Sequence, residues 1–168
     1  MPGSPLFAAV LGLFDAARIL YGPFPRFSGS SETVRRVEVP TGCVLKVVGP
    51  EIAPLLDRSR WPNSSSARQI VFAVVAYEPG NPGELIGVAS VTGDSDFLWQ
   101  IGIDVAAGHQ GRGVGAAMAS LAALETLAQG RVPYWGATNS NVPSIRTALT
   151  IGLVPTYVEV LTRPAHRT

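Results

Sequence analysis

Residues 97–115 read FLWQIGIDVAAGHQGRGVG, and this stretch decides the fold class of the chain. Its first half alternates apolar with mostly polar residues, a period close to two that predicts a strand ending at Val105. Its second half carries glycines at 111, 113 and 115 and leads into an alanine-rich segment that stops at Gly130, which predicts a helix. A strand, a glycine loop and a helix therefore follow one another here.

Further strands and helices are predicted on both sides of this stretch. Before it, two runs of β-branched and aromatic residues are joined by a turn rich in proline and glycine, which predicts an antiparallel hairpin. After it come a strand, a helix and a last strand. The predicted strands are 43–48, 69–77, 84–92, 131–138 and 154–162, and the predicted helices are 51–60 and 143–151. This order predicts an α/β (α+β) fold.

Residues 1–42 carry a different pattern. Apolar side chains recur at intervals of three and four residues, which predicts an amphipathic helix lying on the domain or on a partner; they are Leu6, Val10, Leu13, Ala17 and Leu20. Glycines, prolines and a serine pair over 21–31 predict an irregular connection. The apolar run 6–14 is too short to span a bilayer. We therefore expect an N-terminal helix and connection over 1–42 and the main domain over 43–168.

The composition argues against several classes of function. The chain has 168 residues, of which 46% are hydrophobic, so one domain with a substantial core is expected. Thirteen Lys and Arg against twelve Asp and Glu give a net charge of +1, which leaves no electrostatic footprint for nucleic acid. Cys43 is the single cysteine and the histidines are His109 and His166, so neither a disulfide framework nor a metal site is expected. These features fit a cytoplasmic protein.

The glycine loop predicts an anion site. Glycines at alternate positions remove side chains that would hold a ligand away, and the helix N-terminus behind them offers unpaired N–H groups and about half a positive charge. A Walker phosphate loop is excluded because Gly113 is followed by Val114 and Gly115. A dinucleotide fingerprint is met formally by Gly111, Gly113 and Ala116, but the next strand ends without the acidic residue that holds the ribose. A loop selected only for tight packing is a further alternative.

Two elements of the sequence together resemble one family. The run Gln110-Gly111-Arg112-Gly113-Val114-Gly115 is similar to the acyl-coenzyme A loop of the GNAT superfamily of N-acyltransferases, Gln/Arg-x-x-Gly-x-Gly/Ala. The pair Asn141-x-x-Ser144 and Gly152-Leu153 is similar to the family's Asn-x-x-Ala/Ser followed by Gly-Phe. The resemblance extends over roughly residues 43 to 163 and includes the order of strands and helices.

The resemblance implies a mixed sheet flanked by helices, in which strands 97–105 and 131–138 begin side by side and then splay, leaving a slot for acetyl-CoA. The pantetheine arm is expected to pair with the main chain of the first strand, and the pyrophosphate to take the loop amides, because splayed strands leave backbone groups that need partners. An amide near Ile103 would polarise the thioester oxygen. The residues expected to bind acetyl-CoA are Ile103, Val105, Gln110, Gly111, Arg112, Gly113, Val114, Gly115, Ala116, Asn141 and Ser144.

The family's usual acid and base are missing from this sequence. The resemblance places the tyrosine acid at Ala148 and the glutamate base at Trp99 or Gly136, and none of these three side chains can take up a proton. Asp104 lies next to the proposed pantetheine strand. It is the candidate that could draw a proton from the amine through water.

The resemblance implies an N-acyltransferase that moves an acetyl or similar acyl group from coenzyme A to a primary amine by direct attack in a ternary complex. The acceptor is expected to be a small-molecule or peptide amine, and the scarcity of acidic residues near the slot argues against a polycationic one. The main alternative is a non-catalytic acyl-CoA sensor or interaction module, in which the N-terminal helix mediates homodimerisation or a partner contact. A dinucleotide-dependent oxidoreductase is the third reading.

Overall fold

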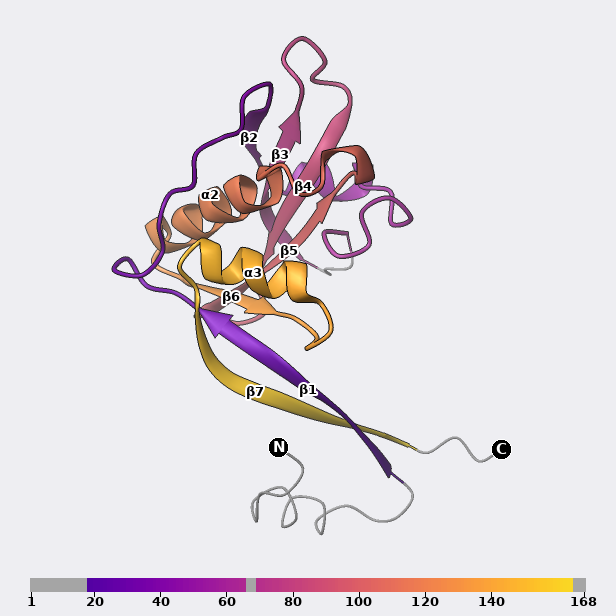
Figure 1. The fold of residues 1–168 in the computed structure, drawn as a ribbon, viewed down its shortest axis with the longest axis vertical. Helices are drawn as coiled ribbons and strands as arrows, with labels where there is room; N and C mark the ends of the chain where they lie inside the picture. Colours follow the sequence, from indigo (N-terminus) through magenta and orange to yellow (C-terminus); the bar gives the residue numbers. More distant parts are fainter. Residues whose placement is uncertain (1–17, 66–68, 165–168) are drawn as a thin grey trace.

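The computed structural model of this protein describes residues 18–65 and 69–164. Within these ranges the chain forms strands, two α-helices and two short 3₁₀ helices (Figure 1). In chain order they are β1 (Arg18–Ser28), β2 (Val44–Val48), η1 (Pro50–Leu55), β3 (Ile70–Tyr77), β4 (Leu85–Thr92), β5 (Leu98–Val105), η2 (Ala107–His109), α2 (Val114–Ala128), β6 (Val132–Gly136), α3 (Val142–Thr150) and β7 (Val154–Pro164). The helix predicted over 51–60 is wrong in type and length, because Pro54 cannot donate to a continuing α-helical ladder.

The strands form one mixed sheet in the order β2-β3-β4-β5-β6-β1-β7. Every neighbouring pair is antiparallel except β5 and β6, which run parallel. A parallel pair needs a crossover connection, and α2 is that crossover. The predicted fold class, a mixed sheet flanked by helices, is therefore confirmed.

Strand β1 replaces the irregular connection predicted over 21–31. The chain is extended from Arg18 to Ser28 and pairs with β6 on one side and β7 on the other, so that prediction is wrong. The helix expected to reach Leu20 is also wrong from Arg18 onward, and the rest of it lies outside the described residues. Two ladders outweigh the local preference of glycine and proline for turns: Pro25, which has no N–H, still accepts from the amide of Ala137 over 3.2 Å.

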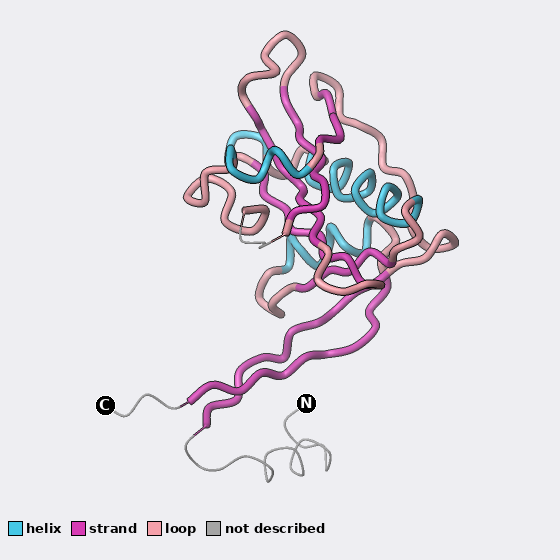
Figure 2. The backbone as a smooth tube through the Cα atoms, turned by 180° about the vertical axis from the view of Figure 1, so that it is seen from behind, coloured by secondary structure: helices cyan, strands magenta, loops and turns pink. Residues whose placement is uncertain are grey.

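The first half of β1 and the second half of β7 leave the body of the protein as a two-stranded ribbon (Figures 1 and 2). The pairing of β1 with β7 runs from Arg18 with Pro164 to Ser28 with Val154, whereas β6 pairs only with 26–28 of β1. The ribbon is therefore held by its own ladder alone over most of its length. Its inner end brings β1 side chains to the edge of the splayed strands.

Two hydrophobic clusters lie on the two faces of the sheet. The larger one packs α2 and α3 onto the sheet through small and medium side chains, with Met118 of α2 fully buried. The smaller one covers the other face beneath η1 and the segment that follows, where Trp61 is 4% exposed. In the described part of the chain, no helix combines the length and the apolar character that crossing a bilayer would take.

The turn between α3 and β7 should depend on glycine at position 152. Gly152 has φ +87°, and a Cβ there would overlap the carbonyl group of Thr33. We expect Gly152→Ala to lower the free energy of unfolding by about 2–5 kcal/mol, from left-handed strain together with overpacking. Gly80→Ala is the matched control, because Gly80 has φ +85° and no atom within 4 Å of the added Cβ. Urea unfolding that gave equal losses for both variants would contradict the packing argument.

Candidate active site

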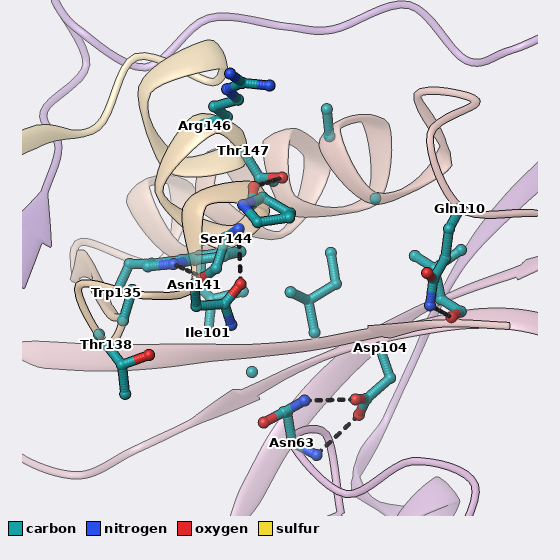
Figure 3. A pocket seen from close by; sticks show the side chains of 18 of the residues that line it. Asn63, Ile101, Asp104, Gln110, Trp135, Thr138, Asn141, Ser144, Arg146 and Thr147 are labelled. Carbon is teal, nitrogen blue, oxygen red and sulfur yellow. Dashed lines mark hydrogen bonds between the residues drawn. The ribbon is translucent and has the colours of Figure 1, made fainter. Parts of the chain in front are cut away.

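A cleft opens where β5 and β6 stop pairing. The two strands pair over three positions, the last being Gln100 with Tyr134, and then separate. Beyond that point β5 stays paired with β4 as far as Val105, whereas β6 pairs with β1 at Gly136. The cleft measures about 800 Å³ and is lined by both strands, the glycine loop and the start of α3 (Figure 3). The splayed sheet that the family resemblance implied is confirmed.

Backbone groups of β5 face this cleft. The amide of Ala106 donates to the carbonyl of Ile86 over 2.9 Å, which sets the register of β5 against β4. Because an antiparallel ladder alternates, the even-numbered residues of β5 turn their N–H and C=O groups toward β4, and the odd-numbered residues turn theirs away. Past the last pair with β6, the odd-numbered residues are Ile103 and Val105. Their polar groups therefore point to the side where the sheet is open.

The glycine loop presents a run of amides to the same cleft. The N–H groups of residues 111–116 make no hydrogen bond to any other part of the chain that the structure describes. Helix α2 begins behind them at Gly113, which has φ +84° and offers no side-chain cap, and the first turn contains no acidic residue. A helix of 15 residues thus directs its positive end at an open space. This arrangement suits the phosphates of an extended ligand whose amide-bearing arm lies along β5.

Side chains hold the loop and helix α3 in place around the cleft (Figure 3). Gln110 donates from Nε2 to the carbonyl of Val105 over 2.9 Å, which ties the loop to the end of β5. Asn141 caps α3, since its Oδ1 accepts from the amide of Ser144 over 3.2 Å. The hydroxyl oxygen of Ser144 accepts from the indole N–H of Trp135 over 3.0 Å. These residues therefore fix the walls of the cleft as well as lining it.

Most of the residues predicted to bind acetyl-CoA line the cleft, and the exceptions are Arg112 and Val114. Val114 is 3% exposed and belongs to the core. Arg112 is exposed, and its Nη1 lies 3.5 Å from Nδ1 of His109. The sequence analysis missed Arg146 and Thr147 of α3, which do line the cleft. Thr147 lies three residues after the predicted Ser144, so helical spacing was the signal that could have found it.

Asp104 is engaged by the protein itself. Its carboxylate accepts from the backbone N–H of Asn63 over 2.9 Å, from the side-chain amide of Asn63 over 2.6 Å and from the N–H of Ser64 over 2.7 Å (Figure 3). Gly102 permits this approach, because a Cβ there would stand 2.5 Å from the carbonyl oxygen of Asn63. Three donors to one carboxylate leave it little free capacity to accept further hydrogen bonds. Asp104 thus anchors the loop that forms one wall of the cleft.

The three positions of the family's usual acid and base hold other groups here. Ala148 is fully buried in the core, so no side chain at that position reaches the cleft. Trp99 packs against Phe72, with ring centroids 6.5 Å apart, and is not among the cleft residues. Gly136 does line the cleft, but a Cβ there would overlap the guanidinium group of Arg26. The space that a side chain at position 136 would fill is therefore occupied by the guanidinium of Arg26.

Arg26 and Phe24 of β1 are cleft residues that the sequence analysis missed. They were missed because residues 21–31 were interpreted as a connection outside the family resemblance. Arg26 forms an ion pair with Glu159 of β7. Its Cζ also lies 5.8 Å from the ring centre of Phe24 and 5.9 Å from that of Tyr134. The ribbon therefore delivers a firmly held cation to the open end of the splay.

Tyr134 completes the surroundings of Arg26. Burial raises the pKa of Tyr134 well above its usual value, and the hydrogen bond that joins the hydroxyls of Tyr134 and Tyr157 over 3.2 Å adds to the shift. The two rings stack with centroids 6.4 Å apart. Tyr134 is thus a neutral hydroxyl throughout the physiological pH range, and it neither takes up nor releases a proton there.

Comparisons with known proteins agree with this geometry. The sequence profile described as the acetyltransferase (GNAT) family matches residues 48–152, and no curated protein is significantly similar in sequence. A GCN5-related N-acetyltransferase from Kribbella flavida superposes with a TM-score of 0.68 at 15% identity, covering 98% of this chain and 65% of that one. A GCN5-related N-acetyltransferase-like protein from Streptococcus suis 89/1591 gives 0.64 at 12% identity, covering 96% and 68%.

A tandem GNAT protein from the clavulanic acid biosynthesis pathway gives a TM-score of 0.61 at 20% identity, covering all of this chain and 60% of that one. This chain therefore spans about two thirds or less of the length of these structures. At such identities the likeness shows the fold. The profile match is of another kind, because it includes the glycine loop and the Asn141 element and extends over more than half of the residues. On that evidence the chain belongs to the GNAT family of acetyltransferases.

Proposed function

We propose that this protein transfers an acetyl or similar acyl group from coenzyme A to a primary amine, with both substrates bound at once. One observation carries the proposal: unpaired loop amides and the unpaired edge of β5 border the same cleft. The amides of 111–116 receive the pyrophosphate, and the main chain of Ile103 and Val105 pairs with the pantetheine arm. Because Gln110 already occupies the carbonyl of Val105, that residue offers only its N–H.

The acyl transfer itself needs few side chains. The amine nitrogen attacks the thioester carbonyl carbon, a C–N bond forms, and the C–S bond breaks to release the coenzyme A thiolate. The nitrogen loses one proton and the thiolate gains one, so the exchange balances without a further reactant. In this proposal the backbone N–H of Ile103 stabilises the developing oxyanion, an interaction worth about 3 kcal/mol when a donor is preorganised.

Arg146 is the cation that supports phosphate binding from α3. It is exposed at the rim of the cleft, whereas Arg112 lies outside the cleft lining. The acceptor enters from the opposite end, between the loop held by Asp104 and the side chains of β1. Homodimerisation and a cytoplasmic location remain predictions of the sequence alone.

A non-catalytic acyl-CoA sensor is the second candidate. It is favoured by the buried Ala148 and by Gly136, whose side-chain space holds the Arg26 guanidinium. Release of free thiol from acetyl-CoA, measured across a library of primary amines at pH 7 to 9, separates the two functions. Turnover with any amine establishes the transferase. Acetyl-CoA binding in calorimetry without turnover by any amine establishes the sensor and overturns the transferase.

The glycine loop should fail as an acyl-CoA site when it carries a negative side chain. We expect Gly113→Asp to weaken acetyl-CoA binding by roughly tenfold or more, because a carboxylate then competes with the phosphates for the helix N-terminus. Gly80→Asp is the control, since Gly80 has nearly the same φ, +85° against +84°, in a distant turn. Isothermal titration with acetyl-CoA measures both variants. Unchanged affinity in Gly113→Asp would refute the placement of the pyrophosphate.

Asp104 is proposed to act as a positioning residue rather than as the base. We expect Asp104→Asn to lower the free energy of unfolding by about 1–3 kcal/mol and to speed hydrogen exchange at Asn63 and Ser64, because an amide nitrogen then faces N–H donors. In kinetics, KM for the amine should rise more than kcat falls, and the pH profile should keep its shape. Asp96→Asn, an exposed aspartate, is the control. A 100-fold loss of kcat with unchanged stability would show that Asp104 is the base instead.

A further inference from the structure

Arg26 lines the cleft, but the proposed acyl transfer assigns it no role. It lies on β1 directly opposite Gly136 of β6, two residues beyond the last pair between β5 and β6. Its guanidinium occupies the space above Gly136 and lines the cleft. An arginine at this position faces the end of the cleft away from the glycine loop, where the acceptor must enter.

The guanidinium of Arg26 is fixed in place but only partly used. Its Nη2 pairs with Glu159, and the rings of Phe24 and Tyr134 lie beside it. The side chain is 17% exposed. Its Nε is buried and has no hydrogen-bond partner among residues 18–65 and 69–164, and Nη1 also makes none there. Because a guanidinium carries five N–H donors, several of them await an acceptor.

No nearby group of the described chain is positioned to satisfy these donors. Asp104, the acidic side chain that lines the cleft, is occupied by Asn63 and Ser64. The other basic side chains that line the cleft, His109 and Arg146, belong to the loop and to α3. Gln100 and Gly136 complete the surface around Arg26 without adding charge. The acceptor end of the cleft therefore presents guanidinium N–H donors without acceptors, beside a wall that carries aromatic rings.

We infer that the acceptor carries a carboxylate as well as its amine, and that Arg26 binds the carboxylate. This inference rests on the proposed acyl transfer and names its substrate class: amino-acid-like acceptors, with the ammonium and the carboxylate on one small molecule. Arginine suits this role because its planar fork matches a carboxylate with two parallel hydrogen bonds. Glu159 holds the fork in orientation and balances its charge before the acceptor arrives. Arg26 is thus a specificity-determining residue.

Matched acceptor pairs test the inference. Each pair differs only by the carboxylate: L-phenylalanine and phenethylamine, L-leucine and 3-methylbutylamine, L-lysine and cadaverine, and γ-aminobutyrate and propylamine. Thiol release from acetyl-CoA gives kcat/KM for every member. We expect the carboxylated member of at least one pair to be preferred by about 10- to 100-fold, the range for a hydrogen-bonded charged group. Equal rates in all pairs, or a preference for the decarboxylated members, would overturn the inference.

Variants assign the preference to Arg26. Arg26→Gln should abolish the preference by raising KM for the carboxylated acceptor more than KM for its decarboxylated partner. Arg26→Lys keeps the positive charge and is the variant expected to fold normally. It should retain part of the preference for carboxylated acceptors. A purely structural role would instead slow both members of a pair equally. Arg58→Gln, at an exposed site outside the cleft, is the control for loss of a positive charge.

A variant of Glu159 should change KM for the carboxylated acceptor in the opposite direction to Arg26→Gln. Glu159→Gln frees Arg26 from its ion pair, so the carboxylated acceptor should bind more tightly and its KM should fall. If Glu159 itself bound a cationic acceptor, the same variant would slow cadaverine most, and the inference would be wrong. Acetyl-CoA titration of every variant distinguishes a failure of the proposed function from a failure of the role assigned to Arg26. Binding without turnover of any amine defeats the proposed function, whereas turnover without carboxylate preference defeats only the role of Arg26.

Discussion

Strand β5 is paired along its length with β4, but on its other side β6 departs after Gln100. Parting two strands leaves polar backbone groups without partners, and such groups are costly unless water or a ligand satisfies them. The loop that follows β5 adds a second set of unpaired amides at the start of α2. The two sets adjoin because the loop is continuous with the strand. The proposed binding surface is therefore made mainly of backbone, which explains how it can exist in a chain of low charge.

Several contacts keep the strands apart. Strand β1 pairs with the far edge of β6 and so draws it into the other half of the sheet. Trp135 and Ser144 join β6 to α3, and α3 in turn is capped by Asn141. On the opposite wall, Asp104 holds the Asn63 segment across β5. Each contact is local and modest, but together they fix an opening that none of the strands would form alone.

The proposed acceptor end of the cleft is assembled from distant parts of the chain. Phe24 and Arg26 come from β1, Gly136 from β6 and Glu159 from β7, and the ladder between β1 and β7 brings them to one place. The absence of a side chain at 136 gains its meaning only from Arg26. In the sequence, Gly136 stands where the family usually has a glutamate base. In the structure, the lack of a side chain at Gly136 leaves room for the guanidinium of Arg26. The pairing of β1 with β6 puts Arg26 opposite Gly136 and so gives that glycine its role.

The amino-acid sequence by itself determined the parts whose physics is local. Alternation over 97–105, glycines at 111, 113 and 115, and the Asn141 cap each act within a few residues, so the strand, the anion loop and the start of α3 were predictable. The tertiary structure alone decided that residues 18–28 form a strand between β6 and β7, that Asp104 is engaged by Asn63 and Ser64, and that Arg26 reaches the cleft. Pairing between strands distant in sequence leaves no periodic signal of its own. Such pairing can also override the turn preference of Pro25, whereas the ladder is interrupted at Gly22 and Pro23.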